Sequence, residues 1–475
     1  PHYNFVNYKG GYPSTFNLSG YVFMNSNKFD NTELTISPGT TLDFPNQNML
    51  VTLNSNLIAN GTSENPITFR GCGYGTNKLD FKGLVIGNRS LNSPSGSPTR
   101  LNYCNFNNLN AEYSVQVGTS SQTNIPLVFE YNTSNPVKDI RIFPTGQNLT
   151  IGNIAYNQMD IHIRAETGKI TTTGVIHIPQ GRTIYFEPYS NGAYYLFNDN
   201  TFLDIEGRMV AEGSSSGKII FDKTAGSWGS YYMNVWGGAS LKYCDIKNSG
   251  NGLNVTYPSS GVLVENCLFE NNNGYDLTIN GFLNPRITAP VVKNNVFNVS
   301  RFQAASLVAY NGANIEISNN TFNNVYGTGI YVSYVNNALL KENIIYASVQ
   351  PGINPVAGIL EYTTGGNINC NYATNFFNGI ILDNSSPKVF NNTITNNSVG
   401  LYLTNGSQPQ LMSSFTATET LLDGGYNRFY NNLYEEIKCN NEGGGSELPL
   451  SIPLMDNGYN SVYHEGLSDC LFNTG

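Results

Sequence analysis

Apolar and polar residues alternate at a period of two through most of the second half of the chain, as at Ile330 and Val332. Apolar side chains two positions apart share one face of a strand, whereas helices repeat every three to four residues. No window shows a sustained helical stripe. This part of the chain is therefore predicted to consist of short β-strands.

A short phrase returns along the same region, with an aromatic or aliphatic residue followed by asparagines. Its copies are YCDIKNSG at Tyr243–Gly250, NCLFENNN at Asn266–Asn273, NNVFNVS at Asn294–Ser300, NNTFNNV at Asn319–Val325, ENIIYAS at Glu342–Ser348 and NNTITNNS at Asn391–Ser398. Equivalent positions, from Cys244 through Cys267, Val296 and Thr321 to Ile344, are 23 to 29 residues apart. Such a period indicates a solenoid, because one copy is too short to bury its own apolar side.

The content of one repeat indicates which solenoid. A second strand-like phrase, such as NGIIL at Asn378–Leu382, follows the asparagines. Strand, asparagine turn and strand in each repeat is typical of an all-β, right-handed parallel β-helix. Asparagine suits the turns because it tolerates the left-handed backbone region and can form stacked hydrogen-bonded ladders. The predicted inward residues are Val264, Leu268, Phe269, Val296, Phe297, Phe322, Ile330, Val332, Ile344, Ile381, Ile394 and Leu401.

Three phrases of the N-terminal half recur in order later in the chain. LTISPGTTLDF at Leu34–Phe44 returns as IHIPQGRTIYF at Ile176–Phe186, LIANGTSENPITF at Leu57–Phe69 as MVAEGSSSGKIIF at Met209–Phe221, and LNYCNFNN at Leu101–Asn108 as LKYCDIKN at Leu241–Asn248. Two starts of one β-helical unit would explain this order. The predicted organisation is an N-terminal cap (1–31), a first β-helical unit (32–110), an irregular β connection or insertion (111–174), the main parallel β-helix (175–432) and C-terminal coils or a cap (433–475).

These phrases resemble the leader and first coils of right-handed parallel β-helix repeat proteins secreted by bacteria. The pair DGGYNRFYNN at Asp423–Asn432 and DNGYNSVYHE at Asp456–Glu465 is similar to the last coils of large surface proteins from Bacteroidetes-like bacteria. The resemblance implies an extracellular or cell-surface location and export as cargo of the type IX secretion route. It does not imply one function, because β-helices serve as lyases, hydrolases, adhesins and stalks.

Charge and hydropathy limit the classes of partner that the chain is expected to bind. Only 12% of the residues are charged, and the net charge is −9 with a pI near 5.0. No basic stripe is present that could neutralise phosphates, which argues against nucleic acid as a partner. No stretch has the apolar length of a membrane helix. The chain opens at Pro1 without a signal peptide, and we expect a mature product whose targeting segment was removed or is not included.

Acid–base residues are sparse. The four histidines are scattered, and the best candidate group is Asp204, Glu206 and Arg208 in FLDIEGRM, which at period two would share an outward strand face. A carboxylate pair beside an arginine could serve acid–base catalysis. The alternative, which we favour, is a solvated strand face with a surface ion pair.

Aromatic residues gather in the same region. A ladder of exposed rings can hold sugars by stacking on their apolar faces. The alternative is that the rings pack in the core or under a turn. The predicted glycan-binding rings are Tyr185, Tyr189, Tyr231, Tyr232 and Trp236.

The seven cysteines show no CxxC pair or metal-ligand spacing, so neither a metal site nor a cofactor is predicted. Cys104, Cys244 and Cys267 share one slot of the repeat and are predicted to be reduced core residues. Cys439 and Cys470 lie outside the regular repeats and would form a disulfide in an oxidising compartment.

Two functions remain from the sequence. The favoured one is a non-enzymatic extracellular or cell-surface protein: an adhesin, a structural rod, or a scaffold that binds glycans or secretion-system and other surface proteins. The alternative is a polysaccharide lyase or glycoside hydrolase that acts on an extracellular polysaccharide. The open strand edges of a solenoid would also favour end-to-end self-association unless they are capped.

Overall fold

In the computed structural model, consecutive strands form the sides of one coil, and each strand pairs in parallel with the corresponding strands of the coils before and after it. The structure describes residues 2–5, 15–17, 22–25, 32–44, 50–53, 55–71, 82–86, 99–109, 111, 113–117, 123–143, 149–164, 169–188, 192–199, 201–224, 230–299, 304–350, 354–411, 427–440, 454–455 and 461–462. No helix occurs among these residues. The chain divides into two compact units, Pro1–Gly237 and Gly238–Gly475, and each is considered by itself.

Unit 1 contains four stacks of parallel strands, one strand per coil in each. Stack A comprises β1 (His2–Phe5), β4 (Thr32–Ile36), β7 (Ser55–Asn60), β10 (Arg100–Asn102), β13 (Thr123–Glu130), β16 (Leu149–Ala155), β19 (Val175–Ile178), β22 (Phe202–Ile205) and β25 (Tyr232–Val235). Stack B comprises β3 (Val22–Asn25), β6 (Leu50–Leu53), β9 (Leu84–Ile86), β12 (Tyr113–Val117), β15 (Asp139–Ile142), β17 (Ile161–Ile163), β20 (Thr183–Phe186) and β23 (Arg208–Glu212). Stack C joins the first half of β16 to β18 (Lys169–Thr172), β21 (Ala193–Phe197) and β24 (Ile219–Lys223). A five-stranded sheet contains β2 (Thr15–Asn17), β5 (Thr41–Phe44), β8 (Ile67–Gly71), β11 (Cys104–Asn107) and β14 (Thr133–Asn135).

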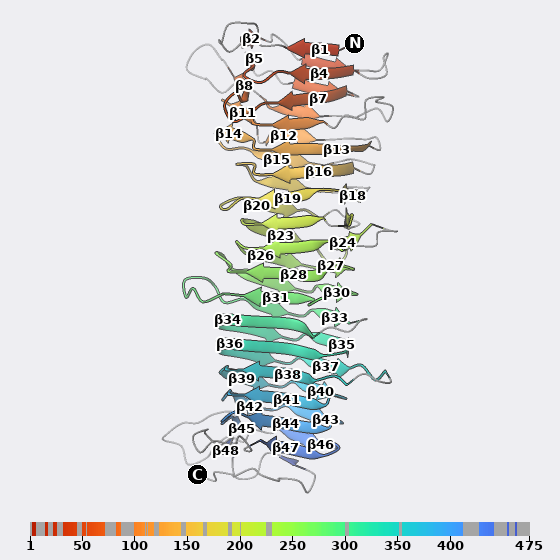
Figure 1. Cartoon of the computed structure of the whole chain (residues 1–475), viewed down its shortest axis with the longest axis vertical. Coiled ribbons are helices and arrows are strands. Elements are labelled where there is room, and N and C mark those ends of the chain that lie inside the picture. The colour runs from red at the N-terminus through yellow and green to blue at the C-terminus, as the bar shows by residue number, and fades with distance from the viewer. Residues whose placement is uncertain are drawn as a thin grey trace. The chain divides into compact units, whose positions relative to one another are not determined.

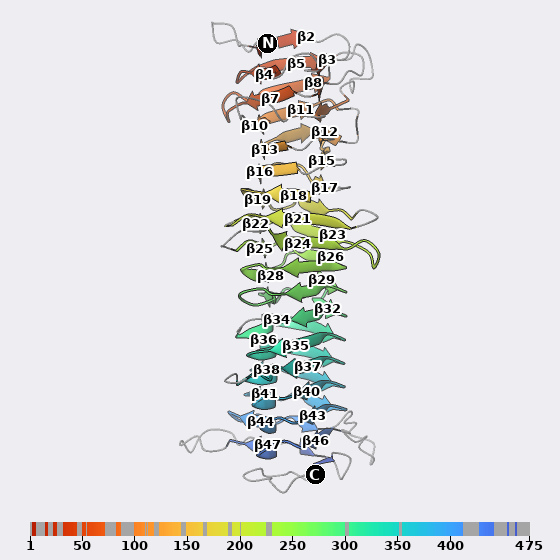
Figure 2. The ribbon, with the colours of Figure 1, turned by 90° about the vertical axis from the view of Figure 1, so that its right-hand side faces the viewer.

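Unit 2 contains three stacks. Stack D, which faces the viewer in Figure 1, comprises β28 (Asn251–Thr256), β31 (Leu277–Asn280), β34 (Ala305–Ser318), β36 (Thr328–Lys341), β38 (Ala357–Tyr362), β41 (Asn378–Asp383), β44 (Val399–Thr404) and β47 (Glu435–Cys439). Stack E joins the second halves of β34 and β36 to β26 (Ala239–Lys242), β29 (Val262–Glu265), β32 (Val291–Lys293), β39 (Gly366–Asn369), β42 (Lys388–Phe390), β45 (Gln410–Leu411) and β48 (Leu454–Met455). Stack F, which faces the viewer in Figure 2, comprises β27 (Cys244–Lys247), β30 (Leu268–Glu270), β33 (Val296–Asn298), β35 (Thr321–Val325), β37 (Ile344–Ala347), β40 (Tyr372–Thr374), β43 (Thr393–Thr395), β46 (Arg428–Tyr430) and β49 (Ser461–Val462).

The predicted parallel β-helix is therefore confirmed. The stretch 111–174, for which an irregular connection or an insertion was expected, contains β12 to β18, and each of these strands is paired in parallel. The two predicted caps, at 1–31 and 433–475, lie largely outside the described residues.

Most of the predicted core register is correct, and four positions are wrong. One is Ile381, which lies between the fully buried Ile380 and Leu382 and therefore points outward. Phe269, Phe297 and Phe322 are fully buried at paired positions of stack F. Their strand neighbours Leu268 and Val296 are only half-buried. Ile344 is 39% exposed, whereas the adjacent Ile345 is fully buried. Adjacent residues of a strand point to opposite faces, so both members of such a pair cannot point inward.

Buried asparagines form a ladder at one corner of unit 2. Its members are Asn295, Asn320, Asn343, Asn371, Asn392 and Asn427, each at most 1% exposed. The side-chain amide of each donates to the Oδ1 atom of the next at 2.9–3.1 Å. The preceding residues Asn294, Asn319, Glu342, Cys370 and Asn391 have φ of 54–58°. The repeated pair of asparagines thus has two roles: the first bends the chain and the second hydrogen-bonds between coils.

Cys244 and Cys267 occupy the same corner slot on the preceding coils of unit 2, and Cys104 occupies a similar slot in unit 1, where its N–H donates to Oδ1 of Asn132 at 3.0 Å. All three are buried, and none is in a disulfide. The backbone N–H of Cys267 donates to Oδ1 of Asn295 at 2.8 Å, as a ladder asparagine would. Burial raises the pKa of the Cys104 thiol, which keeps it protonated. The prediction of reduced core cysteines is confirmed for these three.

Glycines at one register position of stack D allow close packing of adjacent strands. A Cβ atom on Gly379 would lie 2.7 Å from the Gly400 carbonyl oxygen and would overlap the side chain of Ile394. We expect Gly379→Ala to lower the free energy of unfolding by about 1–3 kcal/mol in denaturant titrations. The control is Gly261→Ala, whose nearest contact would be 3.7 Å away. Equal stability of both variants and the parent would contradict the packing role.

Candidate functional site

His177 lies on the outer face of stack A, between two carboxylates. On β19 it pairs in register with Ala155 of the preceding coil and Asp204 of the following one. Its Nδ1 atom is 3.3 Å from Oδ2 of Asp204, and its Nε2 atom is 4.0 Å from Oε1 of Glu206. The imidazole is nearly buried, while both carboxylates are about half exposed. Both ring nitrogens therefore face acidic groups that solvent can reach.

Aromatic rings surround this group. Trp236 follows β25, is 42% exposed, and donates from Nε1 to Oδ1 of Asp204 at 3.2 Å. Phe202, which is 40% exposed, stacks on Tyr232 with ring centroids 5.2 Å apart. We call His177, Phe202, Asp204, Glu206, Tyr232 and Trp236 the aromatic–acidic patch. It spans three consecutive coils, β19, β22 and β25.

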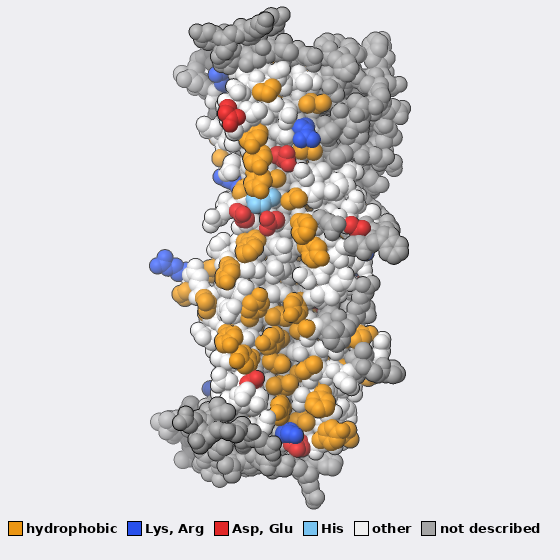
Figure 3. Space-filling model, in the orientation of Figure 1, with side chains coloured by type: hydrophobic (Ala, Val, Ile, Leu, Met, Phe, Trp, Pro, Cys, Tyr) orange, Lys and Arg blue, Asp and Glu red, His pale blue; other side chains and the backbone are white. Residues whose placement is uncertain are grey.

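A ladder of tyrosines leads to this patch. Tyr103, Tyr131 and Tyr156 stack with centroids 4.5 and 4.8 Å apart, and Tyr156 lies 4.2 Å from the ring of His177. Figure 3 shows a column of orange side chains on this face that ends at a pale-blue histidine flanked by red acidic side chains. Because these rings cover one another's faces, they present edges and hydroxyls to solvent. Trp236, by contrast, has no stacked ring neighbour among the described residues.

The structure separates residues that the sequence had placed in one site. The chain bends at Glu206 and Gly207, so Arg208 begins β23 in stack B and does not share the face of Asp204. The alternation of side chains between the two faces of a strand does not continue through a turn, which is why the prediction failed for Arg208. Tyr185 also lies in stack B, where it stacks on His162 at 4.4 Å.

Tyr231 is not a surface ring. It is fully buried, stacks on Phe197 at 4.6 Å, and its hydroxyl donates to the Phe221 carbonyl at 3.0 Å. Its predicted stacking on a ligand is wrong for this reason. Tyr189 and Trp228 lie outside the described residues.

His162 forms a second cluster on stack B. Its Nδ1 atom is 2.7 Å from Glu187, and its Nε2 atom is 3.2 Å from Asp139. Burial alone would lower the pKa of His162, but hydrogen bonds to Asp139 and Glu187 outweigh this and raise the pKa to about 9. The imidazolium is thus held on both sides, and we assign this cluster to stabilisation of the coils.

Three further observations concern metal ions, the predicted disulfide and membrane helices. No group of three or more His, Cys, Asp or Glu side chains in the described part of the chain could hold a metal ion. Cys439 is disulfide-bonded, and its predicted partner Cys470 lies outside the described residues. No helix of the described residues is long and apolar enough to cross a membrane.

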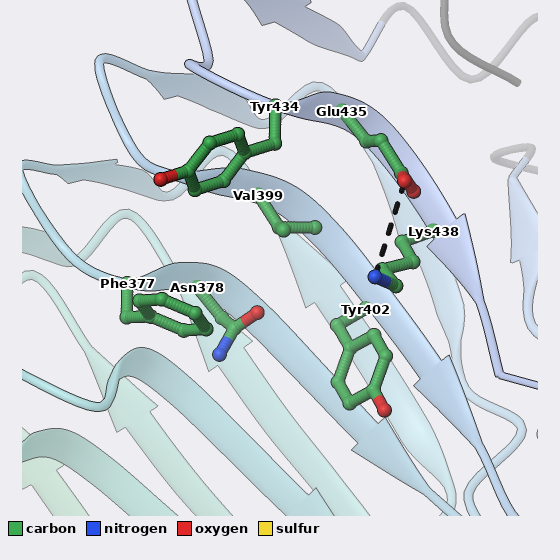
Figure 4. Close-up of a pocket in the computed structure, with 7 residues that line it drawn as sticks. All are labelled: Phe377, Asn378, Val399, Tyr402, Tyr434, Glu435 and Lys438. Atoms are coloured by element: carbon green, nitrogen blue, oxygen red, sulfur yellow. Dashed lines mark ion pairs between the residues drawn. The ribbon is translucent and has the colours of Figure 1, made fainter.

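Sequence reasoning missed a pocket of about 410 Å³ in unit 2, lined by Phe377, Asn378, Val399, Tyr402, Tyr434, Glu435 and Lys438. Phe377 is 52% and Tyr434 65% exposed. Figure 4 shows these two rings on one side of the pocket at different coil levels, with Tyr402 and Lys438 on the other. The available signal was an aromatic residue just before a stack D strand, in NFFNGI and NLYEEI.

Of the comparisons with known proteins, a match to a family model supports the fold. No curated protein matches the chain. A solved structure with 10% sequence identity, the crystal structure of the periplasmic alginate epimerase AlgG, aligns over 98% of this chain and 78% of that chain with a TM-score of 0.17. Residues 289–434 match the family model described as the right handed beta helix region. Together with the parallel pairing of its strands, this match makes the fold a right-handed parallel β-helix.

Proposed function

We propose that the chain is a secreted, non-enzymatic β-helix protein that binds a polysaccharide on the aromatic–acidic patch. The observation that carries the proposal is the Trp236 indole, which is 42% exposed and held by its hydrogen bond to Asp204. A ring that is fixed and open on the surface can stack on a sugar without losing much conformational entropy on binding.

The acidic members of the patch supply the polar half of such a site. Oxygens of Asp204 and Glu206 can accept hydrogen bonds from sugar hydroxyls, and a charged acceptor strengthens these bonds. Asp204 and Glu206 side chains are 43% and 52% exposed. Stacking with a few such bonds would give affinities on the order of micromolar to millimolar for a short oligosaccharide.

The extracellular or cell-surface location belongs to the same proposal. A disulfide at Cys439 supports it, because structural disulfides persist in oxidising compartments. Export by the type IX route and contacts with other surface proteins follow from the resemblance of the sequence and are part of the proposal on that basis.

One observation favours a second candidate, a polysaccharide lyase or glycoside hydrolase. His177 has a carboxylate near each ring nitrogen, and such a group can accept or donate a proton. Incubation with uronic-acid and neutral polysaccharides distinguishes the two functions: new reducing ends or unsaturated products would establish the enzyme, and binding without products supports the non-enzymatic protein.

Trp236→Ala is expected to weaken polysaccharide binding at least tenfold, because the stacking surface is removed. Binding is measured by calorimetry against a panel of neutral and acidic polysaccharides. In a Trp228→Phe background, Trp236 is the only tryptophan, so its emission should shift when the ligand is added.

The matched control is Tyr194→Ala, which removes a ring of equal exposure, 42%, from another stack of unit 1. Its affinity should remain that of the parent. The proposed site would be overturned if no polysaccharide of the panel binds the parent, or if Trp236→Ala binds the ligand with unchanged affinity.

A further inference from the structure

The pocket of unit 2 contains an interrupted aromatic column. Asn378, Val399 and Glu435 pair in register on β41, β44 and β47. The residues just before them, Phe377, Ser398 and Tyr434, therefore occupy one turn slot on three consecutive coils. Backbone hydrogen bonds of 2.8 Å from Val399 to Phe377 and from Tyr434 to Ser398 confirm this alignment. The outer two residues carry rings, and the middle residue carries none.

Unit 1 shows what a filled column looks like. Tyr103, Tyr131 and Tyr156 occupy one turn slot of consecutive coils, with φ of 48–57°, and their rings stack 4.5 and 4.8 Å apart. These distances match the coil spacing of about 4.8 Å. At the Ser398 level a ring is absent, so Phe377 and Tyr434 belong to levels roughly 10 Å apart. That separation accommodates one additional ring, in stacking contact on both faces.

Apart from Val399, the rest of the pocket wall is polar. Asn378, Tyr402, Glu435 and Lys438 line it. The Nζ atom of Lys438 is 3.9 Å from Oε1 of Glu435, longer than a hydrogen bond, and the lysine side chain is 46% exposed. Donors and acceptors of both charges are therefore within one small pocket.

We propose that this pocket binds the pyranose ring of a saccharide between Phe377 and Tyr434, at the level of Ser398. The C–H faces of the sugar contact the two rings, and its hydroxyls hydrogen-bond to the polar wall. A purely aromatic ligand would fill the gap but has too few hydroxyl groups to hydrogen-bond along the polar wall, whereas a pyranose carries several. The site lies in unit 2 and shares no residue with the aromatic–acidic patch, so it stands independently of the proposed function.

The experiment is saturation-transfer NMR on the full chain, with methyl glycosides of glucose, galactose and mannose, N-acetylglucosamine and galacturonate as probes, and p-cresol as the aromatic probe. We expect at least one sugar to bind with a millimolar or tighter Kd. Phe377→Ala and Tyr434→Ala should each weaken this binding at least tenfold. Leu433→Ala, which removes a 71% exposed side chain beside Tyr434 without opening the pocket, should leave it unchanged.

Ser398→Phe is the decisive variant. It supplies the missing ring of the column and should abolish sugar binding while the thermal unfolding midpoint stays equal or rises, so loss of fold cannot explain the result. Unchanged sugar binding by Ser398→Phe would overturn the proposal. So would binding of p-cresol alone, or of no probe. Trp236→Ala should retain this binding, which separates a failure here from a failure of the aromatic–acidic patch.

Discussion

Replacing Phe322 with alanine is expected to lower the free energy of unfolding by about 3–5 kcal/mol. Phe322 is fully buried and stacks on Phe297 with centroids 4.5 Å apart, and Phe297 stacks on Phe269 at 4.9 Å. The substitution removes apolar contacts and leaves a cavity inside this column. Two neighbouring coils lose packing together, because the rings lie on consecutive coils.

Denaturant titration of the full chain measures this effect, with Ile344→Ala as the control on the next coil. Ile344 is 39% exposed, and its truncation should cost below about 1 kcal/mol. A cost of that size for Phe322→Ala would mean that the register of stack F is displaced by one residue.

Glu361→Gln is expected to stabilise the protein at neutral pH by on the order of 3 kcal/mol. Glu361 points into the core, in register with Val332 and Leu382, and is fully buried. Neither carboxyl oxygen has a hydrogen-bond partner among the described residues. Burial raises the pKa of Glu361 from 4.5 to about 8, because the charged form loses its hydration.

The direction of the pH dependence follows from that raised pKa. Below pH 4.5 the carboxyl is protonated in both states and imposes no charge penalty. Between pH 4.5 and about 8 the unfolded chain ionises while the folded chain does not, so stability falls as pH rises. The side-chain amide that Glu361→Gln introduces does not titrate. The free energy of unfolding of the variant should therefore equal that of the parent at pH 4. From there up to pH 8, the variant should become increasingly more stable than the parent.

The difference in free energy of unfolding between variant and parent, measured at each pH, isolates the contribution of Glu361 from that of the other titrating residues. Glu270→Gln serves as the control, since its side chain is 40% exposed beside Lys247, and its difference curve should stay within about 1 kcal/mol. A difference curve for Glu361→Gln that is flat from pH 4 to 8 would show that the carboxyl is hydrated or partnered in the folded chain.

Repetition made the fold predictable. Asparagine turns mark where strands begin and end, and alternation then identifies Phe322, between Thr321 and Asn323, as a core residue. It does not choose between two adjacent apolar residues such as Ile344 and Ile345. Pairing with the preceding coil makes that choice, because it places Ile345 on Phe322.

The candidate sites were less predictable, because turns redirect side chains. Asp204 and Trp236 were correctly grouped, since they come from consecutive coils of one stack. Arg208 was not, because a bend precedes it. Phe377 and Tyr434 are separated by 57 positions in the sequence, and only coil alignment reveals that Ser398 lies between them.

The asparagine ladder also explains where this chain tolerates changes of length. Successive ladder residues are separated by 25, 23, 28, 21 and 35 positions, yet the hydrogen bonds between them differ by only 0.2 Å. One corner of each coil is therefore a fixed anchor point, and variation in length is absorbed at the other corners. Peptides grafted at those other corners would be displayed at regular intervals of one coil, without disturbing the anchored side.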